Sequence, residues 1–166
     1  MNGLLKASIM VACMVCVVFI AGCGGSGESQ QLTFQTVEKT STFLGSSSPI
    51  AEGVYVIRAN SDWLAFWGNI KAYLLVTPSL PPVDFSKNTV IAVVDANRAT
   101  GGYSITVTGV QVTAEGVAVE AVRQSPGPFC LVTSAFEQPY HIVTTPVFSG
   151  GASLNLNRTV LDCPAP

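Results

Sequence analysis

The sequence predicts a mainly β fold with one packed helix, an α+β arrangement built on an antiparallel sheet or a β-sandwich. Most of the chain after residue 31 consists of short stretches in which apolar and polar residues alternate with period two, the pattern of half-buried strands. Turn-forming residues separate these stretches, and a single stretch has helical periodicity. Because strands and helices do not alternate along the chain, repeated βαβ units are disfavoured.

The predicted strands differ in how they are buried. Residues 90–94 form a continuous apolar run, typical of a central strand buried on both faces. Residues 103–108 alternate, and the phase changes after Gly109, which predicts a β-bulge there. Residues 114–116 then form a turn, so the segment after them is a hairpin partner. The remaining strands are predicted at residues 32–36, 53–58, 117–122, 140–145 and 152–157.

The one predicted helix begins near Ser61, a residue type that favours the N-cap position. Apolar side chains follow at spacings of three and four residues, which places them on one helix face. This face consists of Trp63, Phe66, Trp67, Ile70 and Leu74. We expect the face to pack on a sheet, although an aromatic stripe can also serve as a ligand platform. Pro78, Pro81 and Pro82 are expected to end the helix.

The N-terminal segment is typical of an export signal. One Lys and no acidic residue precede an apolar run of about a dozen residues, too short for the ~20 that span a bilayer as a helix. Residues 20–23 read Ile-Ala-Gly-Cys, which resembles the lipobox of bacterial lipoproteins. We therefore expect residues 1–22 to be a cleaved signal peptide and Cys23 to be lipidated. An ordinary secretory signal with a chance cysteine is the alternative.

The remaining chain divides into a tether and one domain. Residues 23–31 hold the lipidated Cys and a Gly- and Ser-rich stretch that suits a flexible tether, and residues 32–166 form the β-rich domain. In lipoprotein sorting an Asp directly after the lipidated Cys favours inner-membrane retention, and Gly24 gives no such signal. We expect a lipid-anchored, extracytoplasmic location in the cell envelope, in the outer membrane if the host is diderm.

Charge and cysteine content narrow the function classes. After residues 1–22 are removed, seven of eight basic and all ten acidic residues remain, so nothing in the charge attracts nucleic acid. Two cysteines, Cys130 and Cys163, then remain for an oxidising compartment, and we expect a disulfide that contributes about 3 to 4 kcal/mol. A catalytic thiol is the alternative. Two Cys and one His cannot build a tetrahedral metal site without carboxylates, so we expect no metal and no cofactor.

Several motifs, in order along the chain, resemble the PrcB C-terminal domain of bacterial lipoproteins. The most specific is residues 100–105, Thr-Gly-Gly-Tyr-Ser-Ile. The supporting motifs are Trp63 with Phe66 and Trp67, and residues 83–86, 126–128 and 139–143. The resemblance covers roughly residues 32–145 and implies a noncatalytic protein that supports, stabilises or docks to a surface protease complex.

Catalysis has little support in the residues themselves. His141 is the only His, so a Ser/His/Asp triad would have to combine it with residues such as Ser134 and Asp95. No Gly-x-Ser-x-Gly elbow is present to expose a nucleophile. We therefore expect no enzyme and interpret His141 as a structural or surface residue.

Two loops are the candidate interaction site. Gly101 and Gly102 lack the Lys and the helix that a phosphate loop needs, which leaves a positive-φ turn or an exposed recognition loop. The predicted interaction residues are Arg98, Thr100, Gly101, Gly102, Tyr103, Pro126, Gly127 and Pro128. Arg98 lies in a polar loop, so its truncation should weaken partner binding with almost no effect on stability. Tyr103 should be partly in the core.

These observations leave two functions open. The first is a membrane-anchored protein-interaction module that serves as an accessory or stabilising subunit of an extracytoplasmic protease complex. The alternative is a protease inhibitor whose loops project from one end of a β scaffold into an active-site cleft. A stabilising subunit would raise the lifetime of active protease, whereas an inhibitor would lower its activity stoichiometrically.

Overall fold

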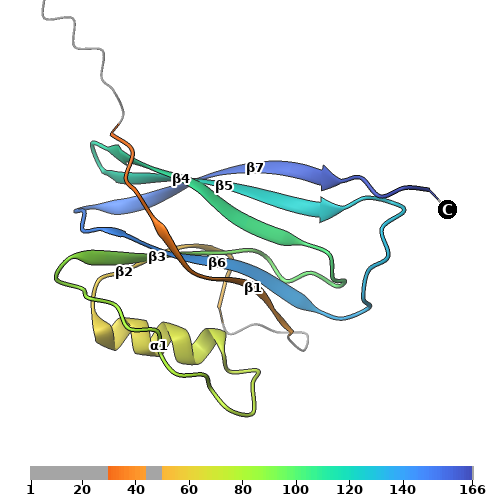
Figure 1. Cartoon of the computed structure of the whole chain (residues 1–166), viewed down its shortest axis with the longest axis horizontal. Coiled ribbons are helices and arrows are strands. Elements are labelled where there is room, and N and C mark those ends of the chain that lie inside the picture. The colour runs from red at the N-terminus through yellow and green to blue at the C-terminus, as the bar shows by residue number, and fades with distance from the viewer. Residues whose placement is uncertain (1–29, 44–49, 166) are drawn as a thin grey trace, which may run out of the picture.

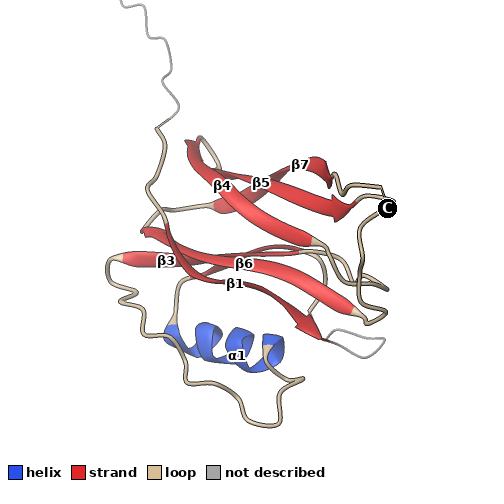
Figure 2. Cartoon of the chain, turned by 45° about the vertical axis from the view of Figure 1, so that its right-hand side comes forward, coloured by secondary structure: helices blue, strands red, loops and turns tan. Residues whose placement is uncertain are grey.

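Within residues 30–43 and 50–165, which the computed structural model describes, the chain forms two β-sheets and one helix. They stack in three layers, with the four-stranded sheet in the middle (Figure 1 and Figure 2). The elements are β1 (Gln35–Phe43), β2 (Gly53–Ile57), α1 (Asn60–Ile70), β3 (Asn88–Val94), β4 (Ser104–Thr113), β5 (Gly116–Pro126), β6 (Glu137–Pro146) and β7 (Gly151–Leu161). The predicted mainly β fold with one packed helix is confirmed.

The middle sheet is antiparallel throughout, with strand order β1-β6-β3-β2. Its two inner strands, β3 and β6, are covered on both faces, by the helix on one side and by the second sheet on the other. No residue of the run from Val90 to Val94 is more than 2% exposed. The prediction of a central strand at residues 90–94 is therefore confirmed.

Helix α1 packs on the outer face of the middle sheet through its aromatic stripe. Trp63, Phe66, Trp67 and Ile70 are buried there, so the stripe belongs to the core. The indole N–H of Trp63 donates to the carbonyl oxygen of Pro81 at 2.9 Å, and that of Trp67 donates to the oxygen of Pro78 at 3.0 Å. Each buried indole thus has a hydrogen-bond partner in the connection that follows the helix.

Both ends of the helix differ from the prediction. Ala59 occupies the N-cap position and Ser61 lies inside the first turn, where its hydroxyl faces Asp62 at 3.4 Å. The helix ends at Ile70, well before the prolines, and Leu74 lies outside it and is partly exposed. The side chain of Lys71 is buried against the sheet at this point, and the chain turns there.

The second sheet has the order β4-β5-β7. Strands β4 and β5 form the predicted hairpin, and their register shifts between Val107 and Gly109, where the bulge was expected. Strand β7 pairs with β5 in parallel, from Gly116 opposite Gly151 to Pro126 opposite Leu161. The sequence did not predict this parallel pair, because apolar alternation is the same in both orientations.

The first described residues run along β4 before they join the middle sheet. The Leu32 N–H donates to the Val110 oxygen at 2.8 Å, and the Val112 N–H donates to the Gln30 oxygen at 2.8 Å. The strand predicted at residues 32–36 is thus displaced to β1, which pairs with β6. The apolar residues of the alternating stretch, Leu32 and Phe34, pack against the core between the two sheets. Among all the described residues, no helix is long and apolar enough to cross a membrane.

Candidate functional site

The two predicted interaction loops meet at one end of the sandwich. The Gly101 N–H donates to the Thr133 oxygen at 2.9 Å, which joins the β3–β4 connection to the β5–β6 connection. Gly102 has a φ of 88°, as predicted for a turn, and a Cβ there would lie 2.8 Å from Val132 Cγ1 and 3.3 Å from Pro126 Cβ. Glycine is required at this position both by the backbone conformation and by the close approach of the second loop.

A disulfide ties this end of the molecule to the C-terminal segment. Cys130 and Cys163 are bonded, with their Cα atoms 5.1 Å apart, so the predicted disulfide is confirmed. The Gly127 N–H donates to the Leu161 oxygen at 3.0 Å, and the Cys130 N–H donates to the Gly127 oxygen at 3.1 Å. The loop after β5 is therefore held to the end of β7 by the disulfide and by one backbone hydrogen bond, and a second backbone hydrogen bond closes a turn within the loop.

Apolar side chains are exposed in the β5–β6 loop that carries Cys130 and at the end of β7, just before Cys163. We call this set the loop surface: Phe129, Leu131, Val132, Phe136, Val160 and Leu161. Leu131 is fully exposed and Phe129 is 54% exposed, although both lie beside a covalent brace that holds the loop in place. Clustered exposed apolar side chains are typical of protein–protein contact sites. Sequence reasoning missed these residues, although the apolar run directly after Pro128 could have indicated them.

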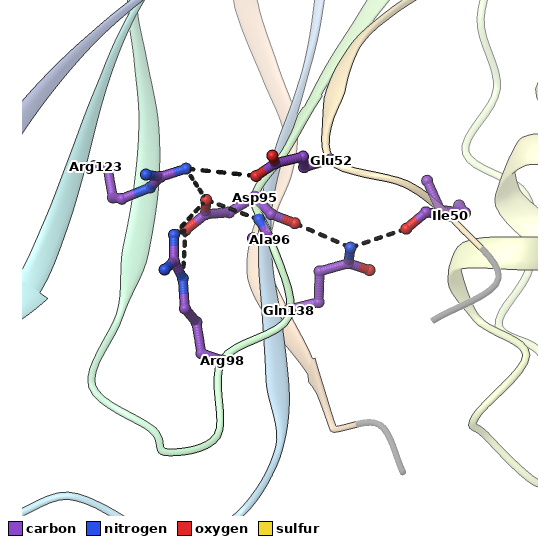
Figure 3. A network of polar contacts seen from close by, with 7 residues as sticks. All are labelled: Ile50, Glu52, Asp95, Ala96, Arg98, Arg123 and Gln138. Atoms are coloured by element: carbon purple, nitrogen blue, oxygen red, sulfur yellow. Dashed lines mark hydrogen bonds and ion pairs between the residues drawn. The ribbon is translucent and has the colours of Figure 1, made fainter. Parts of the chain in front are cut away.

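A buried carboxylate fixes the root of the β3–β4 loop (Figure 3). Asp95 follows the last residue of β3, is completely buried, and accepts hydrogen bonds from the Arg98 guanidinium at 2.8 to 3.2 Å and from the Ala96 N–H at 2.8 Å. It also pairs with Arg123 of β5. Two guanidinium groups and a backbone N–H thus compensate the desolvation of one carboxylate.

The side chain of Gln138 connects the start of the β3–β4 loop to the segment before β2 (Figure 3). Its side-chain N–H group donates to the backbone oxygens of Asp95 and Ile50, each at 2.9 Å. Ile50 precedes β2 and Gln138 lies in β6, so three segments are joined at one amide. The loop therefore starts from a rigid base.

Arg98 has a structural task, which the sequence interpretation did not foresee. Besides its ion pair with Asp95, its backbone forms a bridge to Glu137, and its guanidinium carbon lies 5.0 Å from the centre of the Tyr103 ring. Only 22% of the side chain is exposed. These contacts argue against the expectation that truncation of Arg98 would leave stability unchanged, and we now predict that it lowers stability. Tyr103 is half-buried, as predicted.

His141 is buried between the two sheets, with both ring nitrogens in hydrogen bonds. Its Nδ1 accepts from the Val107 N–H at 2.8 Å, so Nε2 carries the proton and donates to Thr36 Oγ1 at 2.9 Å. Burial, reinforced by the charge of Lys39, lowers the pKa of His141 to about 4. Neither ring nitrogen contacts the suggested partners, because Asp95 is paired with arginines and Ser134 lies in the β5–β6 loop. The triad is not assembled.

Residues 89–146 match the family model described as PrcB C-terminal. The resemblance to the PrcB C-terminal domain that the sequence predicted is therefore confirmed over these residues, which are the second half of the range it was predicted for. No curated protein and no solved structure matches the chain.

The PrcB C-terminal match begins in β3 and ends with β6, so it contains Asp95, both predicted loops and Cys130. Strand β7 and Cys163 lie outside it. The disulfide therefore joins the matched region to the segment that follows β7, outside the matched residues. In the described residues, no group of three or more His, Cys, Asp or Glu could hold a metal ion.

Proposed function

We propose that the protein is a noncatalytic, lipid-anchored interaction module that acts as an accessory or stabilising subunit of an extracytoplasmic protease complex. The observation that carries the proposal is the loop surface, a cluster of exposed apolar side chains held in place by a disulfide and by the buried Asp95 cluster beneath the adjoining loop. A preorganised apolar surface binds a partner without a large loss of conformational freedom. The PrcB C-terminal match supports a protease-associated role.

The place where the described chain begins supports the same function. Gln30 is bonded to Val112 near the end of β4, whereas the loop surface lies beyond the beginning of β4 at Ser104. The ten residues of β4 separate the two ends by about 30 Å. Anchoring through Cys23, which lies outside the described residues, would present the loop surface away from the membrane. Figure 1 shows the start of the coloured N-terminal segment and the C-terminal segment at opposite ends of the sandwich.

The expected location agrees with the disulfide. A disulfide between Cys130 and Cys163 persists in an oxidising compartment, as outside the cytoplasm. Membrane attachment is tested by Cys23→Ala, which should abolish incorporation of a labelled fatty acid. Undiminished label in that variant would remove lipidation from the proposal.

Loop-surface variants test the interaction itself. Leu131→Ser should reduce recovery of the partner when the full-length protein is purified from its own membranes and the bound proteins are identified by mass spectrometry. Leu75→Ser is the matched control, because Leu75 is equally exposed but follows the helix on the other side of the middle sheet. Equal recovery with both variants would exclude the loop surface as the contact site.

An activity assay on the captured partner distinguishes a stabilising subunit from an inhibitor. If the captured partner is a protease, adding the purified protein should lengthen the lifetime of its activity when the protein is a stabilising subunit. An inhibitor would instead abolish activity at a one-to-one ratio. The inhibitor alternative rests on the two loops that meet at one end, since a braced loop can also occupy an active-site cleft.

A further inference from the structure

A pocket lies between the two sheets beside the Asp95 cluster. It has a volume of about 370 Å³ and is bordered by the start of β2 and by strand β7. Leu154 and Leu156 contribute apolar lining, whereas Glu52, Arg123 and Arg158 contribute charged lining. The pocket thus places apolar and charged side chains side by side, so it suits a side chain with a charged end.

The charges around this pocket are not balanced. Arg123 pairs with Asp95 and approaches Glu52 at 3.9 Å, yet its Nε is buried without a hydrogen-bond partner. Arg158 lies opposite Arg123 in the parallel ladder and makes no ion pair with the described chain. The charged residues that line the pocket are two cations, Arg123 and Arg158, and one carboxylate, Glu52. The pocket is therefore locally positive on a chain whose net charge is −2.

Strand β7 also has an unpaired edge. It is the outermost strand of its sheet, and within the described residues no strand pairs with its second edge. Edge strands are normally protected by Pro, bulges or several charged residues. Strand β7 has eleven residues, contains no Pro, shows no register shift against β5 and has one charged residue, Arg158. By contrast, residues 30–32 cover part of the outer edge of β4.

We propose that β7 accepts an extended, acidic segment of a partner protein as an additional strand, with a carboxylate of that segment bound at Arg158 and Arg123. Main-chain hydrogen bonds to the free edge would give affinity, and the locally positive pocket would select an acidic side chain. A second copy of β7 suits this site less well, because β7 contains no Asp or Glu. The inference rests on the proposed interaction function, since it names the chemistry of the partner segment.

Capped synthetic peptides of about nine residues test the site directly. In the probe peptide, Val alternates with Thr and one inward position is Glu, and the comparison peptide has Gln there. Binding to the full chain is measured by isothermal titration calorimetry at low ionic strength. We expect the Glu peptide to bind about tenfold more tightly than the Gln peptide, because charge-assisted hydrogen bonds to arginine are lost in the latter.

Protein variants show whether the preference comes from the pocket. Arg158→Gln should remove the discrimination between the two peptides, and Lys87→Gln should preserve it, because Lys87 is an exposed cation at the opposite end of β3. A probe peptide with N-methylated central amides should not bind, since it cannot pair with a strand edge. Equal binding of the Glu and Gln peptides, or unchanged binding after N-methylation, would overturn the proposal.

Two further outcomes separate this inference from the proposed function. Loss of partner capture in Leu131→Ser, together with no binding of either peptide, would overturn the β7 site and leave the loop surface as the contact. Peptide binding with no partner captured from membranes would support the β7 site while removing the protease-complex function. A concentration-dependent dimer in analytical ultracentrifugation that excludes the peptide would replace the partner segment by a second copy of the chain.

Discussion

Two clusters of buried charge hold the fold together, and they do so in opposite ways. On the helix side, Lys71 is buried with its ammonium 2.7 Å from Glu38 and 2.6 Å from the Tyr140 hydroxyl oxygen. On the other side of the middle sheet, Asp95 is buried with Arg98 and Arg123. The first cluster surrounds one cation with oxygen atoms, and the second surrounds one carboxylate with guanidinium groups.

The clusters differ in how far water can compensate for the loss of a partner. Glu38 is 29% exposed, and burial together with the Glu38 charge raises the pKa of Tyr140, so its phenol stays protonated and donates to Glu38 at 3.0 Å. Asp95 has no exposed surface. Loss of charge in the Asp95 cluster should therefore cost more free energy of unfolding than loss of charge in the Lys71 cluster.

Asp95→Asn should have the largest effect. It keeps the shape of the side chain but leaves Arg98 without its ion-pair partner and Arg123 with only the exposed Glu52 at 3.9 Å, and we expect a loss of about 3 to 5 kcal/mol in the free energy of unfolding. Urea unfolding followed by tryptophan fluorescence measures this loss. Asp162→Asn, at an exposed position after β7, should change stability by less than about 0.5 kcal/mol. A loss equal to that control would show that the carboxylate charge is not required.

His141 sharpens the comparison, because it is buried between the sheets without a counter-charge. Its pKa is about 4 in the folded protein, against an ordinary value of 6.5. As the pH falls below 6.5, the unfolded chain binds a proton that the folded protein does not, so stability falls between pH 6.5 and 4 and is constant in this respect above that range. At about 1.4 kcal/mol per pKa unit, the loss by pH 4.5 is about 2 to 3 kcal/mol.

The matched variant is His141→Gln, which can still accept from the Val107 N–H. The comparison uses urea unfolding of both proteins at pH 7.5 and 4.5. The wild type should lose about 2 to 3 kcal/mol more than the variant over this interval, because the carboxylates titrate in both. Identical pH dependence of the two proteins would show that His141 titrates normally in the fold.

Lys71→Met should have a smaller effect than Asp95→Asn. Methionine fills similar space against Trp67 and Tyr140, but Glu38 and the Tyr140 hydroxyl lose a charged donor, and we expect a loss of about 2 kcal/mol. Lys87→Met is the control, since its ion pair with Asp84 is exposed and should contribute less than about 1 kcal/mol. A loss for Lys71→Met above that for Asp95→Asn would reverse the proposed order of the clusters.

Arg98→Ala should have the smallest effect within the clusters, because Asp95 keeps Arg123 as a partner. We expect a loss of about 1 to 2 kcal/mol and a melting temperature lowered by a few degrees. Differential scanning calorimetry would detect the change. A melting temperature identical to that of the wild type would show that the contacts of the Arg98 side chain do not contribute to stability.

The parts of the fold that the sequence predicted well are those with strong periodicity. The apolar run at residues 90–94, the bulge near Gly109 and the buried helix stripe all follow from local spacing. The position of β1 was predicted wrongly because its residues are mostly polar and lie at the edge of the sheet, where apolar alternation is weak. The parallel pairing of β5 and β7 depends on where β6 leads the chain, and no local pattern records that.

The candidate site was predicted only in outline. The Gly102 turn and the disulfide partners could be read from the residues, because glycine and cysteine have few alternative uses in such a protein. The pairing of Arg98 and Arg123 with Asp95 could not, since Arg123 lies 28 positions from Asp95. One signal was present: Asp95 directly follows a strand buried on both faces, and a carboxylate in that position needs buried partners.

The disulfide closes a covalent ring whose contour runs through both sheets. From Cys130 the chain passes through β6, in the centre of the middle sheet, then through β7, at the edge of the other sheet, and returns at Cys163. The ring therefore contains one strand from each sheet. A partner that pulls on the C-terminal segment cannot peel β7 away from the end that carries Cys163 while the ring is closed. Mechanical load applied there passes through the sulfur bridge into the β5–β6 loop, so a reductase that opened the bridge would leave the end of β7 held mainly by its pairing with β5.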